Sequence, residues 1–516
     1  MAVVGRCCVP TVACSLLPCC PVDKQPRGTD IGYNPCAKSR EAESDRHVIE
    51  PRNTGTDEQR SSAEGPPDVA SDEYEARRDR VYEAIGPGAL AVVQGAPAPR
   101  GFYPFRQSNE FYYLCGIAVP HAYLLLNGRT RQTTLYVPHR DGHHDASGGE
   151  GLFAEDEDGA RHRSGVETVA GVEQLADDLA SPRWRGPTPA FYTPLAPAEG
   201  AAAPRDTRLS AAARAASDPW DGTDSREARL VRFVTGRFPQ FEVRDLSPIL
   251  DRLRLIKSAA EVALLRRAAR LCGRGVLEAM RATRPGVMEY QLAAIAHFVF
   301  ASGGAQGDGY EPIVASGANA WDGHYSANNC ALRTGDLVLM DYAPDYRYYT
   351  SDIGRMWPVD GTYRPWQREL YGFMVEYHTR LLSRIRPGVT AAAILEEAAG
   401  EMEAVIARTA FSKPIYEQAA RRTLVFTGHL SHPVGMAVHD VGDYRPDVLA
   451  PGLVISVDPM MWVPEERLYV RVEDTVVVTG DGIENLTGFV PYALDEVERV
   501  MREPGRMQWN AAIDEP

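Results

Sequence analysis

The sequence predicts a mixed fold of helices and strands whose C-terminal part consists of two similar halves. Helical periodicity and short apolar runs bounded by turn residues occur in the same chain. A short repeat, RPGV, lies at 284–287 and again at 386–389, each time between helical segments. Each copy is followed by a strand-like run that ends in an acid, Asp341 in the first half and Asp458 in the second. We expect the halves to meet at one acidic site.

Length and composition exclude several classes of protein. At 516 residues the chain is long enough for two or three domains, and a hydrophobic fraction of 44% is ordinary for a soluble protein. A net charge of −15 argues against nucleic acid as a partner, because phosphate binding needs a basic surface. No apolar run approaches the roughly 18 residues that span a bilayer. We therefore expect neither nucleic acid nor membrane as a partner.

The first 71 residues are rich in Pro, Gly, Ser and charge and lack apolar periodicity, so residues 1–71 are expected to be a disordered extension. Six of the nine cysteines lie in this segment. A metal-binding tract, an anchor, or neither role is open for this cluster. One early positive charge and no small-residue cleavage site argue against a signal peptide. The cysteines of the body, Cys115, Cys272 and Cys330, are typical of reduced packing residues, which favours a cytoplasmic location.

A smaller domain is expected at 72–251. It begins with helical spacing at 72–85, and strands are expected at 89–95, 106–116, 122–128 and 133–141. Two low-complexity stretches, 141–165 and 196–224, are interpreted as exposed loops. The first contains His143 and His144, which we interpret as solvated rather than metal-binding.

The second domain is expected at 252–502, followed by a tail at 503–516. Ser258 and Glu261 have the spacing of a capping box at the start of a helix. An apolar stripe follows at helical spacing, through Val262, Leu265, Ala269 and Cys272.

Acids in strand-like segments suggest the chemistry. Asp341 follows the run LVLM and Asp352 lies eleven residues later, so a hairpin could place both on one face. In YVRVED, Arg471 and Glu473 share a face by the same alternation. A carboxylate between apolar strand residues is costly to bury without a cation or hydrogen bonds. Each acid alone is more often a satisfied carboxylate, but the ordered set favours two divalent cations.

These segments carry a resemblance to a known family. Residues 252–501 resemble the catalytic domain of the metallopeptidases that include Xaa-Pro aminopeptidase (aminopeptidase P), prolidase and methionine aminopeptidase. The matching pieces are GYEPIVASGANAWDGHY, GDLVLMDYAPDYRYYTSDIGR, HLSHPVGMAVHDVGDY and YVRVEDTVVVTGDGIENLT. The resemblance implies an α+β pita-bread fold with internal pseudo-two-fold symmetry. Residues 74–141 resemble the small α/β N-terminal domain of creatinase and aminopeptidase P.

The resemblance also implies roles for individual residues. Asp341 would bind one ion, Asp352 and Glu473 would bridge both ions, and His432 with Asp458 would complete the other site. His324 and His439 would bind the substrate and stabilise the tetrahedral intermediate, and Arg471 fits the family pattern. The implied cofactors are two divalent ions, Mn²⁺ first, with Zn²⁺ or Co²⁺ as alternatives.

The chain departs from the family pattern close to the site. Asp458-Pro459-Met460 stands where the family has Glu-Pro-Gly, so this ligand, which is also a proton acceptor, is one methylene shorter. Trp462 replaces a tyrosine. The family's substrate-binding histidine corresponds to Gly428, and this chain has His429 instead. These changes affect the expected rate and substrate preference more than metal binding.

Three functions are weighed. The first is a manganese-dependent exopeptidase that hydrolyses the Xaa-Pro bond of peptides through a metal-bridging hydroxide, as an aminopeptidase or a dipeptide-restricted prolidase. The second is a catalytically impaired relative that acts as a binding or assembly protein. The third, a metal-free creatinase-like amidinohydrolase, is disfavoured because all five ligand positions keep an acid or a histidine. A peptide with proline in second position is the expected partner, and a homo-oligomer, a dimer or tetramer, the expected assembly.

Overall fold

The computed structural model of the chain describes residues 69–140, 152–181 and 189–505. The expected N-terminal extension up to residue 68, its cysteine cluster, His143 and His144, and the tail from residue 506 lie outside this part. Among the described residues no helix is long and apolar enough to cross a membrane. Cys115, Cys272 and Cys330 are free thiols; the first two are buried as expected, whereas Cys330 is exposed and is not a packing residue.

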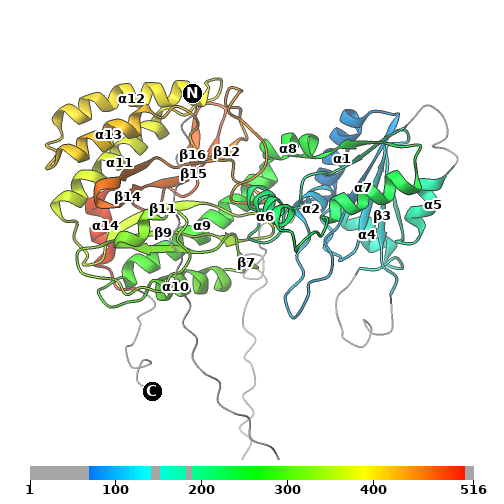
Figure 1. Ribbon diagram of the computed structural model, residues 1–516, viewed down its shortest axis with the longest axis horizontal. Helices are drawn as coiled ribbons and strands as arrows, with labels where there is room; N and C mark the ends of the chain where they lie inside the picture. The colour runs from blue at the N-terminus through cyan, green and yellow to red at the C-terminus, as the bar shows by residue number, and fades with distance from the viewer. Residues whose placement is uncertain (1–68, 141–151, 182–188, 506–516) are drawn as a thin grey trace, which may run out of the picture. The chain divides into compact units, whose positions relative to one another are not determined.

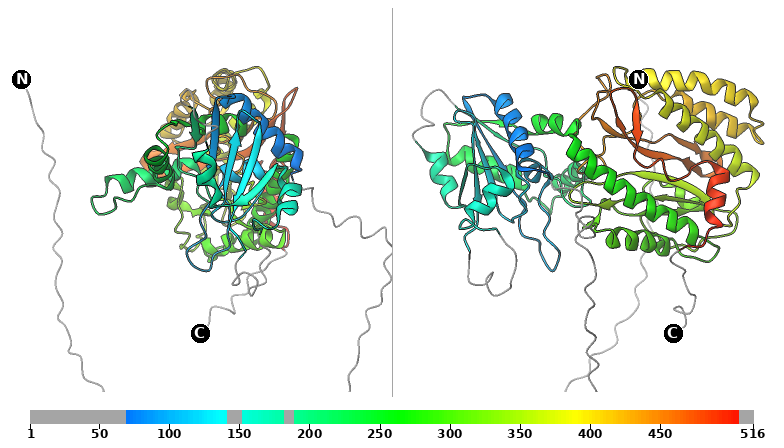
Figure 2. Two further views of the ribbon diagram at one scale, coloured as in Figure 1. Left: turned by 90° about the vertical axis from the view of Figure 1, so that its right-hand side faces the viewer. Right: turned by 180° about the vertical axis from the view of Figure 1, so that it is seen from behind.

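The N-terminal part is a six-stranded mixed sheet in the order β4-β3-β2-β1-β5-β6 (Figures 1 and 2). β1 pairs antiparallel with β2 and parallel with β5. The strands are β1 (Ala89–Gln94), β2 (Tyr123–Asn127), β3 (Gln132–Val137), β4 (Thr168–Gly171), β5 (Ala190–Thr193) and β6 (Glu242–Asp245). The helices are α1 (Ser71–Ile85), α2 (Asn109–Cys115), α4 (Glu157–Ser164), α5 (Gln174–Ala180), α6 (Arg205–Ser217), α7 (Arg226–Arg237) and α8 (Ser247–Leu255).

Three of the interpretations made for this part are wrong. The segment 106–116, expected as a strand, contains helix α2, in which six of the seven residues are buried, so no one-sided apolar pattern marks it as a helix. The stretches 141–165 and 196–224, expected as exposed loops, contain helices α4 and α6. Both helices are rich in polar residues or alanine and bury only a few side chains, so they lack the apolar stripe by which a helix is recognised.

The C-terminal part is built on an antiparallel sheet in the order β12-β15-β11-β9-β8, with β16 paired to β15 (Figure 1). The larger strands are β8 (Ile313–Ser316), β9 (Leu337–Asp341), β11 (Ile353–Pro358), β12 (Val454–Val457), β15 (Glu473–Val478) and β16 (Ile483–Asn485). Two short ribbons are formed by β7 (Gly307–Asp308) with β10 (Pro344–Asp345) and by β13 (Met460–Val463) with β14 (Leu468–Arg471). The helices are α9 (Ala259–Ala282), α10 (Glu289–Ser302), α11 (Pro365–Arg384), α12 (Ala391–Arg408), α13 (Pro414–Val425) and α14 (Leu494–Met501), with 3₁₀ turns η3 (Gly317–Trp321) and η4 (Pro464–Glu466).

The RPGV repeat marks a real internal symmetry. Gly286 and Gly388 both have positive φ, and each lies between two long helices. The N–H of Gly286 donates to the carbonyl of Leu332, and that of Gly388 donates to Leu449, both at 2.9 Å. Each of these leucines precedes the acid of its own half by nine residues, Asp341 after Leu332 and Asp458 after Leu449. The two acids therefore occupy equivalent positions in the two halves.

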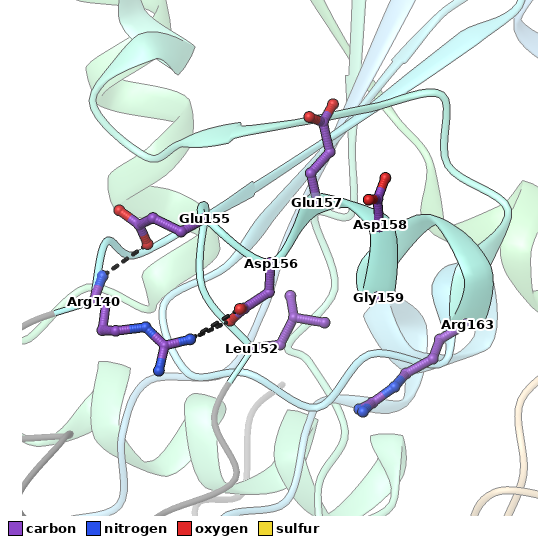
Figure 3. Close-up of a pocket in the computed structure, with 8 residues that line it drawn as sticks. All are labelled: Arg140, Leu152, Glu155, Asp156, Glu157, Asp158, Gly159 and Arg163. Carbon is purple, nitrogen blue, oxygen red and sulfur yellow. Dashed lines mark hydrogen bonds and ion pairs between the residues drawn. The ribbon is translucent and has the colours of Figure 1, made fainter.

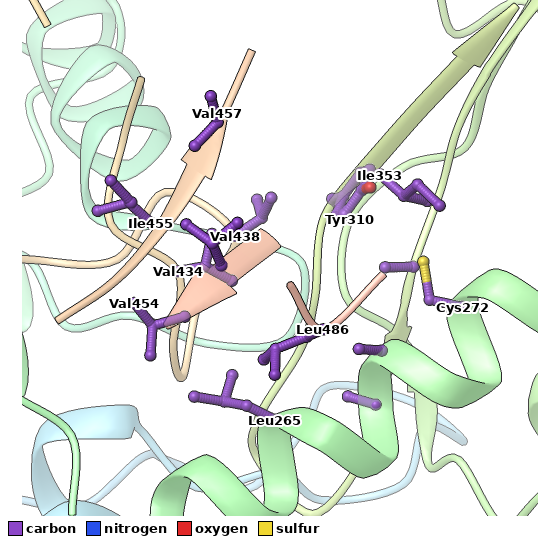
Figure 4. Close-up of a cluster of buried hydrophobic side chains, with 14 of the residues drawn as sticks. Leu265, Cys272, Tyr310, Ile353, Val434, Val438, Val454, Ile455, Val457 and Leu486 are labelled. Atoms are coloured by element: carbon purple, nitrogen blue, oxygen red, sulfur yellow. The ribbon is translucent and has the colours of Figure 1, made fainter. Parts of the chain in front are cut away.

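The hydrophobic core of the C-terminal part lies between helix α9 and the sheet. The predicted capping box is present: Ser258 accepts from the N–H of Glu261, whose carboxylate accepts from the N–H of Ser258. Leu265 and Cys272 on α9, Ile353 on β11 and Leu486 are all buried, and they lie in one cluster (Figure 4). This apolar packing fixes α9 against the strands that carry the acids.

A buried ionic network ties β11, β15 and α11 together. Arg355 Nη2 lies 2.6 Å from Asp474 Oδ1, and His378 Nε2 lies 2.8 Å from Asp474 Oδ2. Thr487 Oγ1 also donates to Asp474 at 2.6 Å. Burial alone would raise the pKa of Asp474, but Arg355 and His378 hold it below its ordinary value. The carboxylate is therefore the partner that compensates a fully buried guanidinium.

Asp474→Ala is expected to lower the free energy of unfolding by about 3–5 kcal/mol, because it leaves the charge of Arg355 buried without its partner. Urea denaturation measures this loss. Asp481→Ala, which removes an exposed acid from the turn before β16, is the matched control and should stay within about 0.5 kcal/mol of wild type. Equal stabilities of the two variants would show that the network does not hold these strands.

Candidate active site

The site lies where the two halves of the sheet meet, at the pairing of β11 with β15. Gly354 of β11 is paired with Asp341 of β9 on one side and with Glu473 of β15 on the other. Asp352 directly precedes β11, and Asp458 directly follows β12, which pairs with β15. Because adjacent strands lie about 4.8 Å apart, this register brings the four acids into one patch. The expected hairpin placement of Asp341 and Asp352 is confirmed.

Gly354 leaves the space in which these side chains meet. A Cβ on Gly354 would lie 2.9 Å from Oε2 of Glu473 and 2.9 Å from Nε of Arg471, closer than real Cβ atoms approach other atoms. Gly354 is not among the glycines with positive φ. The glycine is therefore required for space rather than for backbone conformation.

His432 reaches the acids from the loop before β12. Its carbonyl accepts the N–H of Ser456 at 2.9 Å, which fixes the loop to the strand. Its Nε2 lies 3.3 Å from Oδ2 of Asp352. Asp352, His432 and Glu473 each offer a ligand atom, and these atoms all lie within 4.8 Å of one another. Three of the five predicted ligands thus surround one point.

Burial makes it unfavourable for all four acids to be ionised together. Each of the four acids is at most 8% exposed. Burial, with the neighbouring charge of Asp341, raises the pKa of Asp352 to about 8. Burial likewise raises the pKa of Asp458 and of Glu473 well above their ordinary values. The carboxylates can ionise together only when positive charge compensates them.

Arg471 supplies part of that charge. Its guanidinium forms ion pairs with Asp341 and with Glu473, the latter at 2.9 Å, and its Nε lies 3.5 Å from Oδ1 of Asp458. One guanidinium leaves an excess of negative charge, and Asp458 Oδ1 has no hydrogen-bond partner among the residues that the structure describes. Carboxylates with a single imidazole suit divalent cations such as Mn²⁺ or Zn²⁺. The donor set therefore fits the metal ions expected from the sequence.

Comparison with known proteins identifies the family. Residues 263–480 match Metallopeptidase family M24, and residues 74–183 match the Aminopeptidase P, N-terminal domain. The Xaa-Pro aminopeptidase of Escherichia coli (strain K12) is 30% identical over 456 residues, which cover 84% of this chain and 98% of that protein. The chain belongs to metallopeptidase family M24. The expected family is confirmed, and both the N-terminal match and this relative are of the aminopeptidase P type.

Solved structures of M24 proteins share the fold. Proline aminopeptidase P II from Yersinia pestis is 29% identical with a TM-score of 0.69, over 84% of this chain and 99% of that one. Zn-substituted E. coli aminopeptidase P in complex with product is 29% identical with a TM-score of 0.67, over the same shares. The expected fold, an M24 catalytic domain after a smaller N-terminal domain, is confirmed. The numbered domain bounds stay a prediction.

Two residues that contact the predicted ligands were not found by sequence reasoning. Tyr310 Oη lies 2.6 Å from Oδ1 of Asp341 and 2.9 Å from Oδ1 of Asp352, so its single O–H can donate to either carboxylate. Ser456 Oγ donates to Glu473 at 2.5 Å. Such partners orient ligating carboxylates. Tyr310 lies in GYEPIVASG, one of the segments that carry the family resemblance. A single tyrosine hydroxyl has no sequence motif of its own, so this contact could not be predicted.

All eight predicted site residues line one cavity of about 850 Å³. The ring of His439 lies 4.2 Å from that of His432 and 6.2 Å from that of His324, measured between centroids. Of the two histidines expected to bind substrate, His439 therefore lies beside the predicted ligand His432, and His324 lies next to His439. Their roles, and those of the metal ligands, stay predictions.

The departures from the family pattern lie around a second, more apolar cavity of about 450 Å³. Asp458, Met460 and Trp462 line both this cavity and the catalytic one. His429 lines the second cavity and not the one that holds the predicted site residues. Its ring packs against Phe426 at 5.0 Å, and burial lowers its pKa. The displaced histidine thus lies next to the catalytic cavity rather than within it.

A third hollow, of about 730 Å³, lies in the N-terminal part and contains none of the M24 site residues (Figure 3). Two of its acids contact Arg140. Arg140 pairs with Asp156 at 2.9 Å, and its N–H donates to Glu155 at 3.1 Å. We assign it no part in catalysis.

Gly354→Ala is expected to weaken Mn²⁺ binding by about tenfold or more, because its Cβ would displace Glu473 from the site. Calorimetric titration of the metal-free protein measures the change. Gly372→Ala on helix α11, where a Cβ meets open space, is the control and should bind Mn²⁺ as wild type does. Unchanged affinity in Gly354→Ala would place the metal elsewhere.

Proposed function

We propose that this M24 chain removes the first residue from peptides that carry proline in second position. The observation that carries the proposal is the gathering of four buried acids and His432 around the β11–β15 pairing. The names of the similar proteins, Xaa-Pro aminopeptidase and proline aminopeptidase P II, support the substrate. Both relatives match over at least 84% of this chain, so the likeness includes the catalytic and the N-terminal parts.

Two divalent cations are proposed as cofactors, with Mn²⁺ first. Asp341 would hold one ion, and His432 with Asp458 would hold the other. Asp352 and Glu473 would bridge them. Such a pair of ions polarises a scissile carbonyl and lowers the pKa of a shared water, so that no serine or cysteine nucleophile is needed. The Zn-substituted aminopeptidase P of E. coli, a relative that accepts a divalent metal, supports this choice of cofactor.

The remaining side chains would accept a proton, bind the peptide and compensate charge. Asp458 can accept a proton from the attacking water, because its Oδ1 has no hydrogen-bond partner among the described residues. His324 and His439 can bind the peptide, because both line the same cavity as the metal-site acids. Arg471 forms ion pairs with Asp341 and Glu473 and so supplies part of the positive charge that the buried acids need.

Purified protein with added Mn²⁺ tests this function directly. Xaa-Pro dipeptides and longer Xaa-Pro peptides should both be compared with the same peptides carrying alanine in second position. Release of the first residue from the proline peptides is expected, and the length dependence separates an aminopeptidase from a prolidase. Metal-loaded protein without hydrolysis would contradict the proposal and favour the impaired relative that binds without cleaving. The cytoplasmic location and the homo-oligomer stay predictions.

Asp352→Ala and Glu473→Ala are each expected to abolish turnover, because removal of a bridging carboxylate leaves two cations repelling each other. The rate of Xaa-Pro hydrolysis at saturating Mn²⁺ measures this. Glu465→Ala, which removes an exposed acid from η4, should leave the rate unchanged. Near-normal turnover in either ligand variant would mean that the assignment is wrong.

Asp458→Glu is expected to raise Mn²⁺ affinity and turnover together, because the family's longer side chain reaches farther toward the ions. The apolar cavity of about 450 Å³ beside Asp458 offers room for one methylene. A misplacement of about 1 Å can cost on the order of a hundredfold in rate. Titration of Mn²⁺ against activity in both proteins decides the point. Weaker binding with lower turnover in the glutamate variant would show that the aspartate already reaches.

A further inference from the structure

Helix α6 forms part of the wall of the catalytic cavity, although its sequence shows no motif. Asp206, Thr207, Ser210 and Arg214 on this helix line the same cavity as the metal-site acids. Asp206, Ser210 and Arg214 are spaced four residues apart, which places them on one face of the helix. The alanine-rich stretch 196–224 therefore contributes side chains to the site.

Asp206 makes a direct contact with a predicted substrate-binding residue. Its Oδ2 lies 2.6 Å from Nδ1 of His439. When the ring is neutral and this carboxylate accepts from Nδ1–H, the proton is held on Nδ1 and the ring orientation is fixed. Nε2 is then the nitrogen left for the substrate.

Buried ion pairs fix both ends of this contact. Arg205, next to Asp206, is buried and pairs with Glu110 at 2.8 Å. Asp440, next to His439, is buried and pairs with Lys257 at 3.1 Å. Arg254 joins the two groups, because its guanidinium forms ion pairs with Glu199 and with Asp440. Glu199 lies 4.0 Å from Arg205, so the frame is continuous from α6 to the loop that carries His439.

The contact itself adds little to stability. The side chain of Asp206 is 56% exposed and that of His439 is 34% exposed, and pairs of this kind contribute about 0–1 kcal/mol. The buried ion pairs hold the Asp206 carboxylate at the wall of the catalytic cavity. Its position is therefore better explained by the orientation it gives His439 than by a contribution to fold stability.

We propose that Asp206 is a positioning residue, which orients His439 so that Nε2 faces the peptide. The catalytic consequence of this inference rests on the proposed peptidase function. The orientation of His439 depends only on contacts within the protein. It also assigns a function to α6, since deletion or redesign of this helix would remove the carboxylate from the site.

The orientation is tested by nitrogen NMR on protein labelled with ¹⁵N-histidine, with the His439 signal assigned through His439→Gln. At alkaline pH, wild type and Asp206→Glu should carry the proton on Nδ1, whereas Asp206→Ala should shift it toward Nε2. Asp218→Ala, at the other end of α6, is the matched control and should resemble wild type. An identical His439 signal in wild type and Asp206→Ala would overturn the inference, whatever the activity.

The catalytic consequence is tested by kinetics on an Xaa-Pro peptide. Asp206→Ala should lower kcat about tenfold or more, with KM, Mn²⁺ affinity and melting temperature unchanged, and Asp206→Glu should recover part of the rate. In a His439→Gln background the same change should have no further effect. A kcat within twofold of wild type, or additive losses in the double variant, would overturn the inference. A wild-type protein without Xaa-Pro hydrolysis, but with the expected His439 signals, would overturn the proposed function and keep the orientation.

Discussion

Mutual repulsion among four buried carboxylates is the constraint on which this structure depends. Asp341, Asp352, Asp458 and Glu473 are each at most 8% exposed, and one patch of antiparallel sheet carries them all. Ionised acids in such a place raise one another's pKa unless cations are present. Neighbouring residues stabilise the negative charge in part: Arg471 contributes a guanidinium, and Tyr310 and Ser456 contribute hydroxyl donors. Divalent cations would supply the positive charge that these groups do not.

The internal symmetry explains how a single chain brings these acids together. Each half offers an acid nine residues after its leucine, and the halves join through the antiparallel pairing of β11 with β15. Gly354 stands at that junction, so the two sets of side chains can meet above it. Below the site, Arg355 and Asp474 bind the same two strands through a fully buried ion pair. Of the predicted ligands, Asp341 and Glu473 thus lie in strands, and Asp352 and Asp458 directly adjoin strand ends, which favours a rigid geometry. His432 comes from a loop that is hydrogen-bonded to β12.

The sequence allowed the catalytic half to be predicted better than the N-terminal part. Acids at the ends of apolar strand runs, a capping box at Ser258 and the RPGV repeat are local patterns, and all of them are present in the structure. Helix α2 was misinterpreted because its aromatic residues favour strands locally and because it is buried on nearly all sides, which leaves no helical periodicity to recognise. Helix α6 has no apolar stripe at all.

Contacts between distant residues could not be predicted, for a different reason. Arg254 and Asp440 are 186 residues apart, and Asp206 and His439 are 233 residues apart. A charged residue in a sequence does not show which distant partner will be buried with it. The contribution of α6 to the catalytic cavity therefore becomes visible only when the two parts of the chain are folded together.

Anomalous diffraction at the manganese edge, on crystals grown with Mn²⁺, tests the central claim most directly. The account predicts two peaks about 3.5–4 Å apart, with Asp352 and Glu473 bridging them and His432 binding only one. A single peak, or peaks remote from the β11–β15 pairing, would contradict it.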